Sequence, residues 1–287
     1  ATAHSKRKRD GSRRRYYVFN AFGVARQKLL LNALLPFARS HPSQFLSNGG
    51  RSAACKALLA FASDPEFQNG FFVKADIHAY FDAISHEYLE EVLPAPRAII
   101  RTILLLHGWR FTGGAMGQRG IPQGSSVSSL VGEIVMADVL ASAADQLPAR
   151  LITYADDIGG LVPVEEDAVS LSEILKHAFR THGAGPFSVE PIVRSLTHTS
   201  RFLGYEFRRN ADGTFEVNAP PGKSDAKHIE LTNEFAEART GQQLTAVCRN
   251  LQAFHAAYPL AQDVQEMTRE VIGFMRAELE QRFGRNS

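Results

Sequence analysis

The sequence predicts an α+β fold with a helical C-terminal subdomain, and three observations lead to this prediction. Short apolar runs with strand character alternate with longer segments in which apolar residues recur at helical spacing. From about residue 226 onward, only the helical spacing remains. No segment repeats along the chain, and no low-complexity tract follows the basic N-terminal stretch. This order of elements is typical of an α+β protein.

The length and composition are those of a folded protein with one to three subdomains. The chain has 287 residues, of which 44% are hydrophobic, so it can bury a substantial core. The net charge is only +2, although residues 6–15 hold seven Lys or Arg and one Asp. No apolar run is long enough for a membrane span. Cys55 and Cys248 match no metal spacing, so we expect buried free thiols in a cytoplasmic protein.

The predicted helices follow from apolar spacing and from capping residues. Ser85 is a favourable N-cap, and Glu87 and Glu90 lie in the first turns of the helix that follows it. Helices are predicted at residues 24–38, 51–63, 86–93, 97–107, 126–144 and 165–181. After a linker-like segment at 220–225, two more are predicted at 242–258 and 264–283.

The predicted strands are short apolar runs bounded by turn signals. Asp10-Gly11 is a strong two-residue turn signal between basic arms, so residues 6–19 are predicted to form a hairpin. Residues 71–77 indicate a buried strand, and residues 151–164 indicate two strands around the acidic turn Ala155-Asp156-Asp157. Further strands are predicted at 187–192, 201–209 and 214–218.

Three aspartates stand where a two-metal site needs carboxylates. Phosphoryl transfer assisted by two Mg²⁺ ions requires acidic side chains from separate segments that converge on the ions. Asp76 ends the strand at 71–77, while Asp156 and Asp157 lie on the turn between two apolar strands. Each feature alone is also ordinary turn or strand-end chemistry. Together they predict a metal site at one end of the sheet.

Five segments, in this order, resemble the reverse transcriptase family, in particular its prokaryotic branch, which includes group II intron-like and stand-alone defence-type enzymes. They are GGRSAACKAL (49–58), KADIHAYFDAISHEYL (74–89), GIPQGSSVSSLVGEIVMADV (120–139), YADD (154–157) and FLGYEF (202–207). The resemblance covers about residues 8–207. It implies a right-hand polymerase, with fingers at 1–70, a palm of antiparallel sheet and helices at 71–219, and a helical thumb at 220–287.

The resemblance assigns roles around the metal ions and the nucleotide sugar. Asp76, Asp156 and Asp157 would be the catalytic metal ligands, and the backbone carbonyl of Ile77 would be a further contact. The cofactor would be two Mg²⁺ ions, for which Mn²⁺ can substitute. Phe81 would be the sugar gate that leaves no room for a ribose 2′-hydroxyl and so selects dNTPs. The alternative is that Phe81 is an ordinary core residue.

The remaining roles concern the nucleotide and the primer–template. Nucleotide binding is implied for Gln123, Tyr154, Lys8 and Arg14, and primer or template contact for Arg26, Arg51, Gly204 and Tyr205. If the hairpin register differs, Arg13 or Arg15 takes the place of Arg14. The alternative to a hairpin is that residues 6–15 form a solvated basic tail. The family's Lys that follows YADD has no counterpart in residues 187–200, where Arg194 or His198 would have to donate the proton to pyrophosphate.

The function implied is RNA-directed DNA polymerisation, the addition of dNTPs to a primer 3′ end. The implied partners are an RNA template, the DNA product strand and dNTPs, with no membrane. A dedicated noncoding RNA, partner proteins and an oligomer are left open. The absence of intron-maturation parts favours a stand-alone bacterial enzyme, with anti-phage defence as one setting. A scaffold that binds RNA without catalysis is the alternative, and the three intact aspartates count against it.

Overall fold

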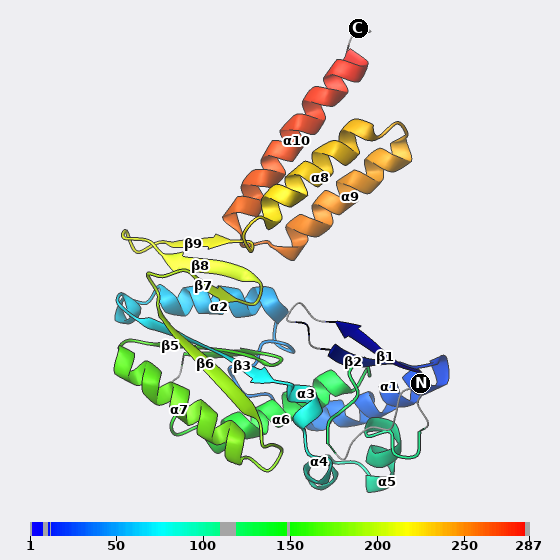
Figure 1. The fold of residues 1–287 in the computed structure, drawn as a ribbon, viewed down its shortest axis with the longest axis vertical. Coiled ribbons are helices and arrows are strands. Elements are labelled where there is room, and N and C mark those ends of the chain that lie inside the picture. The colour runs from blue at the N-terminus through cyan, green and yellow to red at the C-terminus, as the bar shows by residue number, and fades with distance from the viewer. Residues whose placement is uncertain (1, 8–10, 12, 110–118, 148–149, 285–287) are drawn as a thin grey trace. The chain divides into compact units, whose positions relative to one another are not determined.

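The computed structural model describes residues 2–7, 11, 13–109, 119–147 and 150–284 (Figure 1). Helices and antiparallel strands alternate along the chain, which confirms the predicted mixed class. The chain divides into two compact units, and each is described by itself. The first unit comprises residues 1–54 and 71–193, and the second comprises residues 55–70 and 194–287. The predicted boundaries of fingers, palm and thumb remain a prediction.

The first unit begins with the predicted hairpin. Strands β1 (Thr2–Arg7) and β2 (Arg13–Val18) pair antiparallel. Helix α1 (Ala21–Leu34) continues into the 3₁₀ turn η1 (Leu35–Phe37). It begins three residues before the predicted start, because the Asn20 side chain accepts a hydrogen bond of 2.9 Å from the amide of Gly23 and caps the helix.

A four-stranded sheet in the order β4-β5-β3-β6 forms the centre of the first unit (Figure 1). Its strands are β3 (Phe71–His78), β4 (Leu151–Tyr154), β5 (Asp157–Val162) and β6 (Ser188–Ser195). Strand β5 pairs antiparallel with both β3 and β4. Buried side chains of β3 (Val73, Ala75 and Ile77) and of β5 (Ile158 and Val162) belong to one hydrophobic core with those of the surrounding helices, which gives the strand ends a rigid support.

Two long helices supply most of the helical part of that core. Helix α6 (Ser128–Ser142) is apolar around most of its circumference, and most of its residues are buried. Helix α7 (Glu165–Thr181) is amphipathic, packs against β3 and β5, and has the predicted bounds. Shorter elements complete the unit: α3 (Tyr80–Ala83), α4 (His86–Val92), α5 (Arg97–Ile99) and the π-helical turn η3 (Ile100–Leu104). Ser85 caps α4 as predicted, by accepting from the Tyr88 amide.

Helix α2 (Gly50–Ala62) gives its first residues to the first unit and the rest to the second. The second unit also contains the 3₁₀ turn η2 (Pro65–Phe67), a three-stranded sheet and three helices (Figure 1). The strands are β7 (Ser200–Phe202), β8 (Tyr205–Arg209) and β9 (Phe215–Asn218), and the helices are α8 (Lys223–Glu237), α9 (Gly241–Ala257) and α10 (Gln262–Phe283).

Two expectations about the second unit were wrong. Residues 220–225 are not wholly a linker, because α8 begins at Lys223. Buried Ser224 donates a hydrogen bond of 2.8 Å to Asp263 of α10, so a tertiary contact holds the first turn of α8 in place. Cys55 is buried as expected, but Cys248 is exposed, at the edge of a groove between α9 and α10. Within the described ranges, no helix combines the length and apolarity needed to cross a membrane.

Candidate active site

The three predicted catalytic aspartates lie at the same end of the four-stranded sheet. Asp76 of β3 is opposite Asp157 of β5 in the antiparallel register, and Asp157 is opposite Tyr154 of β4 on its other side. Ala155 and Asp156 form the turn between β4 and β5. Ala155 has a φ of 54°, a left-handed conformation that L-residues rarely adopt and that often marks functional turns.

The carboxylates interact electrostatically. Asp76 is exposed, whereas Asp157 is partly buried. Burial raises the pKa of Asp157 to about 6; Lys74 opposes this increase, and the negative charges of Asp156 and Asp76 add to it. Neighbouring carboxylates disfavour each other's ionisation in this way.

The donor chemistry fits a hard divalent cation. Mg²⁺ prefers oxygen ligands, and the carboxylates of Asp76, Asp156 and Asp157 at this end of the sheet are ligands of that kind. No three His, Cys, Asp or Glu side chains of the described residues are arranged as a ready ligand set for one ion. Ile77 follows Asp76 with its side chain 1% exposed in the core, so its backbone carbonyl is the group left for the predicted contact.

The predicted sugar gate lies directly after this strand. Phe81 of α3 is partly buried and contacts the Tyr80 ring edge-on, with the ring centroids 5.6 Å apart. The Tyr80 hydroxyl donates a hydrogen bond of 2.6 Å to the carbonyl of Gly132 in α6. A Cβ added at Gly132 would lie 3.1 Å from the Phe81 ring, so α6 lies close behind that ring. Phe81 is therefore held in place while part of its ring remains exposed.

The segment that contains Gln123 lies between α3 and the N-terminal hairpin. The Gln123 side-chain amide donates hydrogen bonds of 3.4 Å to the carboxylate of Asp82, and its backbone carbonyl accepts one of 2.7 Å from the Tyr17 amide. Gly124 has a φ of 97°, and a Cβ there would lie 2.4 Å from the Tyr17 carbonyl oxygen. The backbone of this segment therefore approaches the hairpin closely at Gly124, where a side chain would not fit.

The predicted basic contacts are described only in part. Lys8 lies outside the described residues. The backbone of Arg14 lies in β2 opposite Lys6. A two-residue turn at Asp10-Gly11 would set it opposite Arg7, so the hairpin forms with a register that differs by one residue from the predicted one. Arg26 of α1 is partly buried, with its guanidinium carbon 5.6 Å from the Phe22 ring centroid, and Arg51 lies in the first turn of α2. Their roles stay predictions.

The predicted primer-grip segment forms a tight hairpin in the second unit. Phe202 of β7 pairs with Tyr205 of β8, and Leu203 and Gly204 form the turn with φ values of 49° and 79°. Positive φ at both central residues is typical of a type I′ turn. The Tyr205 side chain is buried, with its ring centroid 5.8 Å from that of Tyr258. A primer contact at this turn would therefore have to come from the backbone of Gly204.

Comparison with known proteins decides the family. The sequence matches the family model described as reverse transcriptase (RNA-dependent DNA polymerase) over residues 6–207. The chain belongs to the reverse transcriptase family. Members of this family are nucleotidyltransferases. No curated protein sequence matches the chain significantly.

Solved structures confirm the right-hand polymerase fold for this reverse transcriptase-family chain. Apo telomerase from Candida tropicalis matches with a TM-score of 0.54 and 12% identity, over 91% of this chain and 51% of that one. Candida tropicalis telomerase in complex with the TWJ fragment of telomeric RNA matches with a TM-score of 0.51 and 13% identity, over 92% and 47%. At such identities the likeness shows the fold alone. The chain spans about half the length of these telomerase chains.

Some polar residues near the site were not predicted from the sequence. Lys74, two residues before Asp76 and therefore on the same face of β3, influences the pKa of Asp157. Strand alternation was the signal that could have identified it. Asp82 binds Gln123, and no local pattern indicates that contact. Arg194 donates a hydrogen bond of 3.2 Å to the Thr199 carbonyl in the second unit, which does not test its role as a proton donor.

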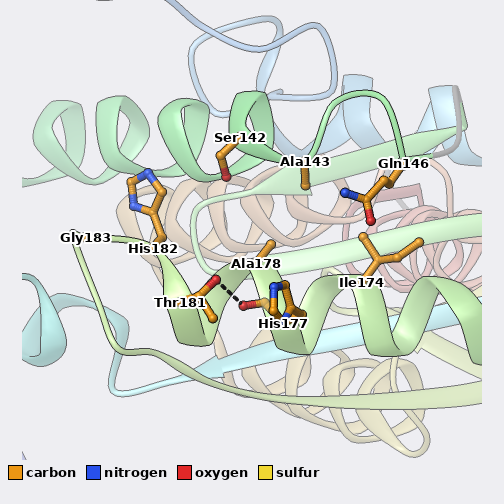
Figure 2. A pocket seen from close by; sticks show the side chains of 9 residues that line it. All are labelled: Ser142, Ala143, Gln146, Ile174, His177, Ala178, Thr181, His182 and Gly183. Atoms are coloured by element: carbon orange, nitrogen blue, oxygen red, sulfur yellow. Dashed lines mark hydrogen bonds between the residues drawn. The ribbon is translucent and has the colours of Figure 1, made fainter.

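A separate hollow lies between the C-terminal parts of α6 and α7 (Figure 2). It has a volume of about 350 Å³, and its lining includes Ser142, Gln146, His177 and His182. The Thr181 hydroxyl donates a hydrogen bond of 2.9 Å to the carbonyl of His177 at its edge. None of the residues predicted for catalysis lines it, so we place the candidate active site at the aspartates.

Proposed function

We propose that the chain is an RNA-directed DNA polymerase that adds dNTPs to a primer 3′ end. The observation that carries the proposal is the register that sets Asp76 opposite Asp157, next to the turn that holds Asp156, in a chain of the reverse transcriptase family. A scaffold that only binds RNA has no need of three neighbouring carboxylates at one end of the sheet.

The aspartates are the residues that would hold two Mg²⁺ ions, with the carbonyl of Ile77 as a further oxygen ligand and Mn²⁺ as a substitute. When bound, the ions would lower the pKa of the primer 3′-hydroxyl and stabilise the charge of the leaving pyrophosphate. In the reaction, a bond forms between the primer 3′-oxygen and the α-phosphorus, and the bond from that phosphorus to the pyrophosphate oxygen breaks.

The nucleotide would lie between the aspartates and the segment that contains Gln123. Phe81 would lie against C2′ of the sugar and exclude a 2′-hydroxyl. The other proposed contacts are Gln123 and Tyr154 with the nucleotide and primer end, Lys8 and Arg14 with the triphosphate, and Arg26, Arg51 and the backbone of Gly204 with the primer or template. The buried Tyr205 side chain would support the turn and would not touch the primer. The pairing of Gln123 with the N-terminal hairpin supports a shared pocket for the first two groups.

The narrower assignment rests on the motif resemblance. We propose a prokaryotic, group II intron-like or stand-alone enzyme whose template is RNA, in the setting of anti-phage defence. A dedicated noncoding RNA template and partner proteins belong to that proposal. Sequencing the nucleic acid that co-purifies with the protein tests it, since a single enriched noncoding RNA supports it and random cellular RNA contradicts it.

The activity itself is tested by primer extension on matched RNA and DNA templates, each with dNTPs and with rNTPs. We expect extension on the RNA template with dNTPs, dependent on added Mg²⁺ or Mn²⁺. RNA binding without extension on either template, under all four nucleotide and template combinations, would support the scaffold instead. Asp76→Asn is the control, because it removes a proposed ligand charge and leaves the side-chain size nearly unchanged.

A further inference from the structure

A buried histidine holds the segment that leads to Gln123. His86, in the first turn of α4, is 7% exposed, and its Nε2 lies 2.7 Å from the carbonyl oxygen of Gly120. The two residues are 34 positions apart in the sequence. A contact of this length between a side chain and a distant carbonyl fixes the position of that peptide group.

The same peptide segment is held from its other side by the backbone of α3 and the residues that follow it. The Gly120 amide donates a hydrogen bond of 2.7 Å to the Ile84 carbonyl, and the Ile121 amide donates one of 2.8 Å to the Phe81 carbonyl. Gly120 has a φ of 93°, and a Cβ there would lie 2.9 Å from the Asp82 carbonyl oxygen. The segment thus lies against the residues that border the predicted sugar gate.

We propose that His86 is a positioning residue for nucleotide selection, which orients the Gly120–Gly124 segment and, through it, the side chain of Gln123. This inference rests on the proposed function, since it assigns a purpose to the predicted nucleotide contact of Gln123. His86 touches neither the aspartates nor Gln123 in any described contact; it acts through the Gly120 carbonyl.

The hydrogen-bonding requirement fixes the form of the imidazole. A carbonyl oxygen only accepts, so Nε2 of His86 carries the hydrogen and Nδ1 is the acceptor in the neutral ring. Nδ1 lies 3.4 Å from Nε2 of His107, which donates to it. Burial lowers the pKa of His86; the hydrogen bond to Gly120 and the charge of Glu90 oppose this decrease, whereas His107 and Arg119 add to it. The neutral ring with hydrogen on Nε2 is therefore the form that fits this site.

A second side chain anchors the beginning of the segment. Arg119 donates a hydrogen bond of 3.1 Å to the Ala83 carbonyl and another to the carbonyl of Gly185. Arg119 thus fixes the entry to the segment, and His86 fixes the peptide that follows. Because Gln123 lies only three residues beyond Gly120, release of the Gly120 carbonyl would displace the Gln123 side chain from Asp82.

The test compares three variants in single-nucleotide extension. His86→Leu keeps an apolar side chain of similar bulk but leaves the Gly120 carbonyl without its donor. His86→Gln restores an N–H near the position of Nε2. His107→Phe keeps the neighbouring ring and leaves the bond to Gly120 intact. We expect His86→Leu to raise the KM for dNTP about tenfold or more with a much smaller change in kcat, since one to two decades is the usual effect of a lost buried hydrogen bond.

We expect His86→Gln to restore the KM to within about threefold and His107→Phe to change it less than about twofold. An unchanged KM in His86→Leu overturns the proposal. So does a loss of activity that His86→Gln does not restore and that follows the fraction of unfolded protein.

Hydrogen exchange tests the same proposal without requiring catalytic activity. In His86→Leu, the amides of residues 119–125 should exchange faster than in wild type, while those of β3 and α6 keep their rates. Equal acceleration throughout the first unit means a purely structural role, and no acceleration means that His86 does not hold the segment. If wild type extends no primer at all, the proposed function fails, and the exchange comparison still decides whether His86 holds the segment.

Discussion

Replacement of Phe81 by Ala should convert a selective polymerase into one that accepts rNTPs. The ring is fixed between the edge of Tyr80, at 5.6 Å between centroids, and the backbone of Gly132 in α6. It therefore cannot retreat from a 2′-hydroxyl toward the helix. A ribose hydroxyl against the ring loses its water partners without replacement, at a cost of roughly 1–3 kcal/mol. That free energy corresponds to about fivefold to 150-fold discrimination, to which steric overlap adds.

The assay is single-nucleotide extension with a dNTP and the matching rNTP on one primer–template. Wild type should prefer the dNTP by at least about tenfold in kcat/KM, and Phe81→Ala should bring the ratio within a few-fold of one. Phe81→Tyr is the matched control, because it keeps the ring and should keep the preference. Equal use of both nucleotides by wild type, or an unchanged ratio in Phe81→Ala, would show that Phe81 is only a core residue.

Three further predictions concern Gly124, Glu133 and the basic residues of the N-terminal hairpin. Gly124→Ala should lower the Tm by several degrees, because the new Cβ would lie 2.4 Å from the Tyr17 carbonyl oxygen and because residue 124 has a φ of 97°. An unchanged Tm in thermal unfolding would contradict this contact. Burial raises the pKa of Glu133 from 4.5 to about 7, so the folded state binds this proton more tightly than the unfolded state. The free energy of unfolding should therefore fall by at most roughly 3 kcal/mol as the pH rises from about 4.5 through 7. Urea titrations at several pH values should show that loss in wild type and not in Glu133→Gln, and parallel curves would refute it. Lys8→Ala and Arg14→Ala should raise the KM for dNTP more than they weaken duplex binding. Unchanged dNTP kinetics after deletion of residues 1–15 would show that these residues form a tail without a role in nucleotide binding.

The elements that the sequence predicted well are those with a strong local pattern. Helix α7 has three acidic residues in its first turn and a regular apolar stripe, so both of its ends could be read from the sequence. Strand β3 is a mainly apolar run, interrupted by Lys74, that ends near Asp76. The start of α8 was missed because Gly222 and its neighbours resemble a linker, whereas the contact of Ser224 with Asp263 that holds this turn is tertiary.

For the candidate site as well, features within a short motif could be predicted from the sequence, and contacts between distant segments could not. The types and order of the acidic residues could be predicted, because they lie in short motifs. The pairing of Asp76 with Asp157 is a property of sheet register, which follows from distant strands rather than from either motif. The bond from His86 to Gly120 joins two motifs that were each identified, but no local spacing indicates that they touch.

The central claim is that Asp76, Asp156 and Asp157 form the catalytic centre of a polymerase, and Asp156→Asn tests it most directly. The substitution removes one charge from the turn between β4 and β5, where burial and neighbouring carboxylates already disfavour ionisation of Asp157. Folding should therefore be preserved, as circular dichroism and thermal unfolding would show. Primer extension on an RNA template with dNTPs should fall by several orders of magnitude. Near-normal extension by a folded Asp156→Asn protein would contradict the account.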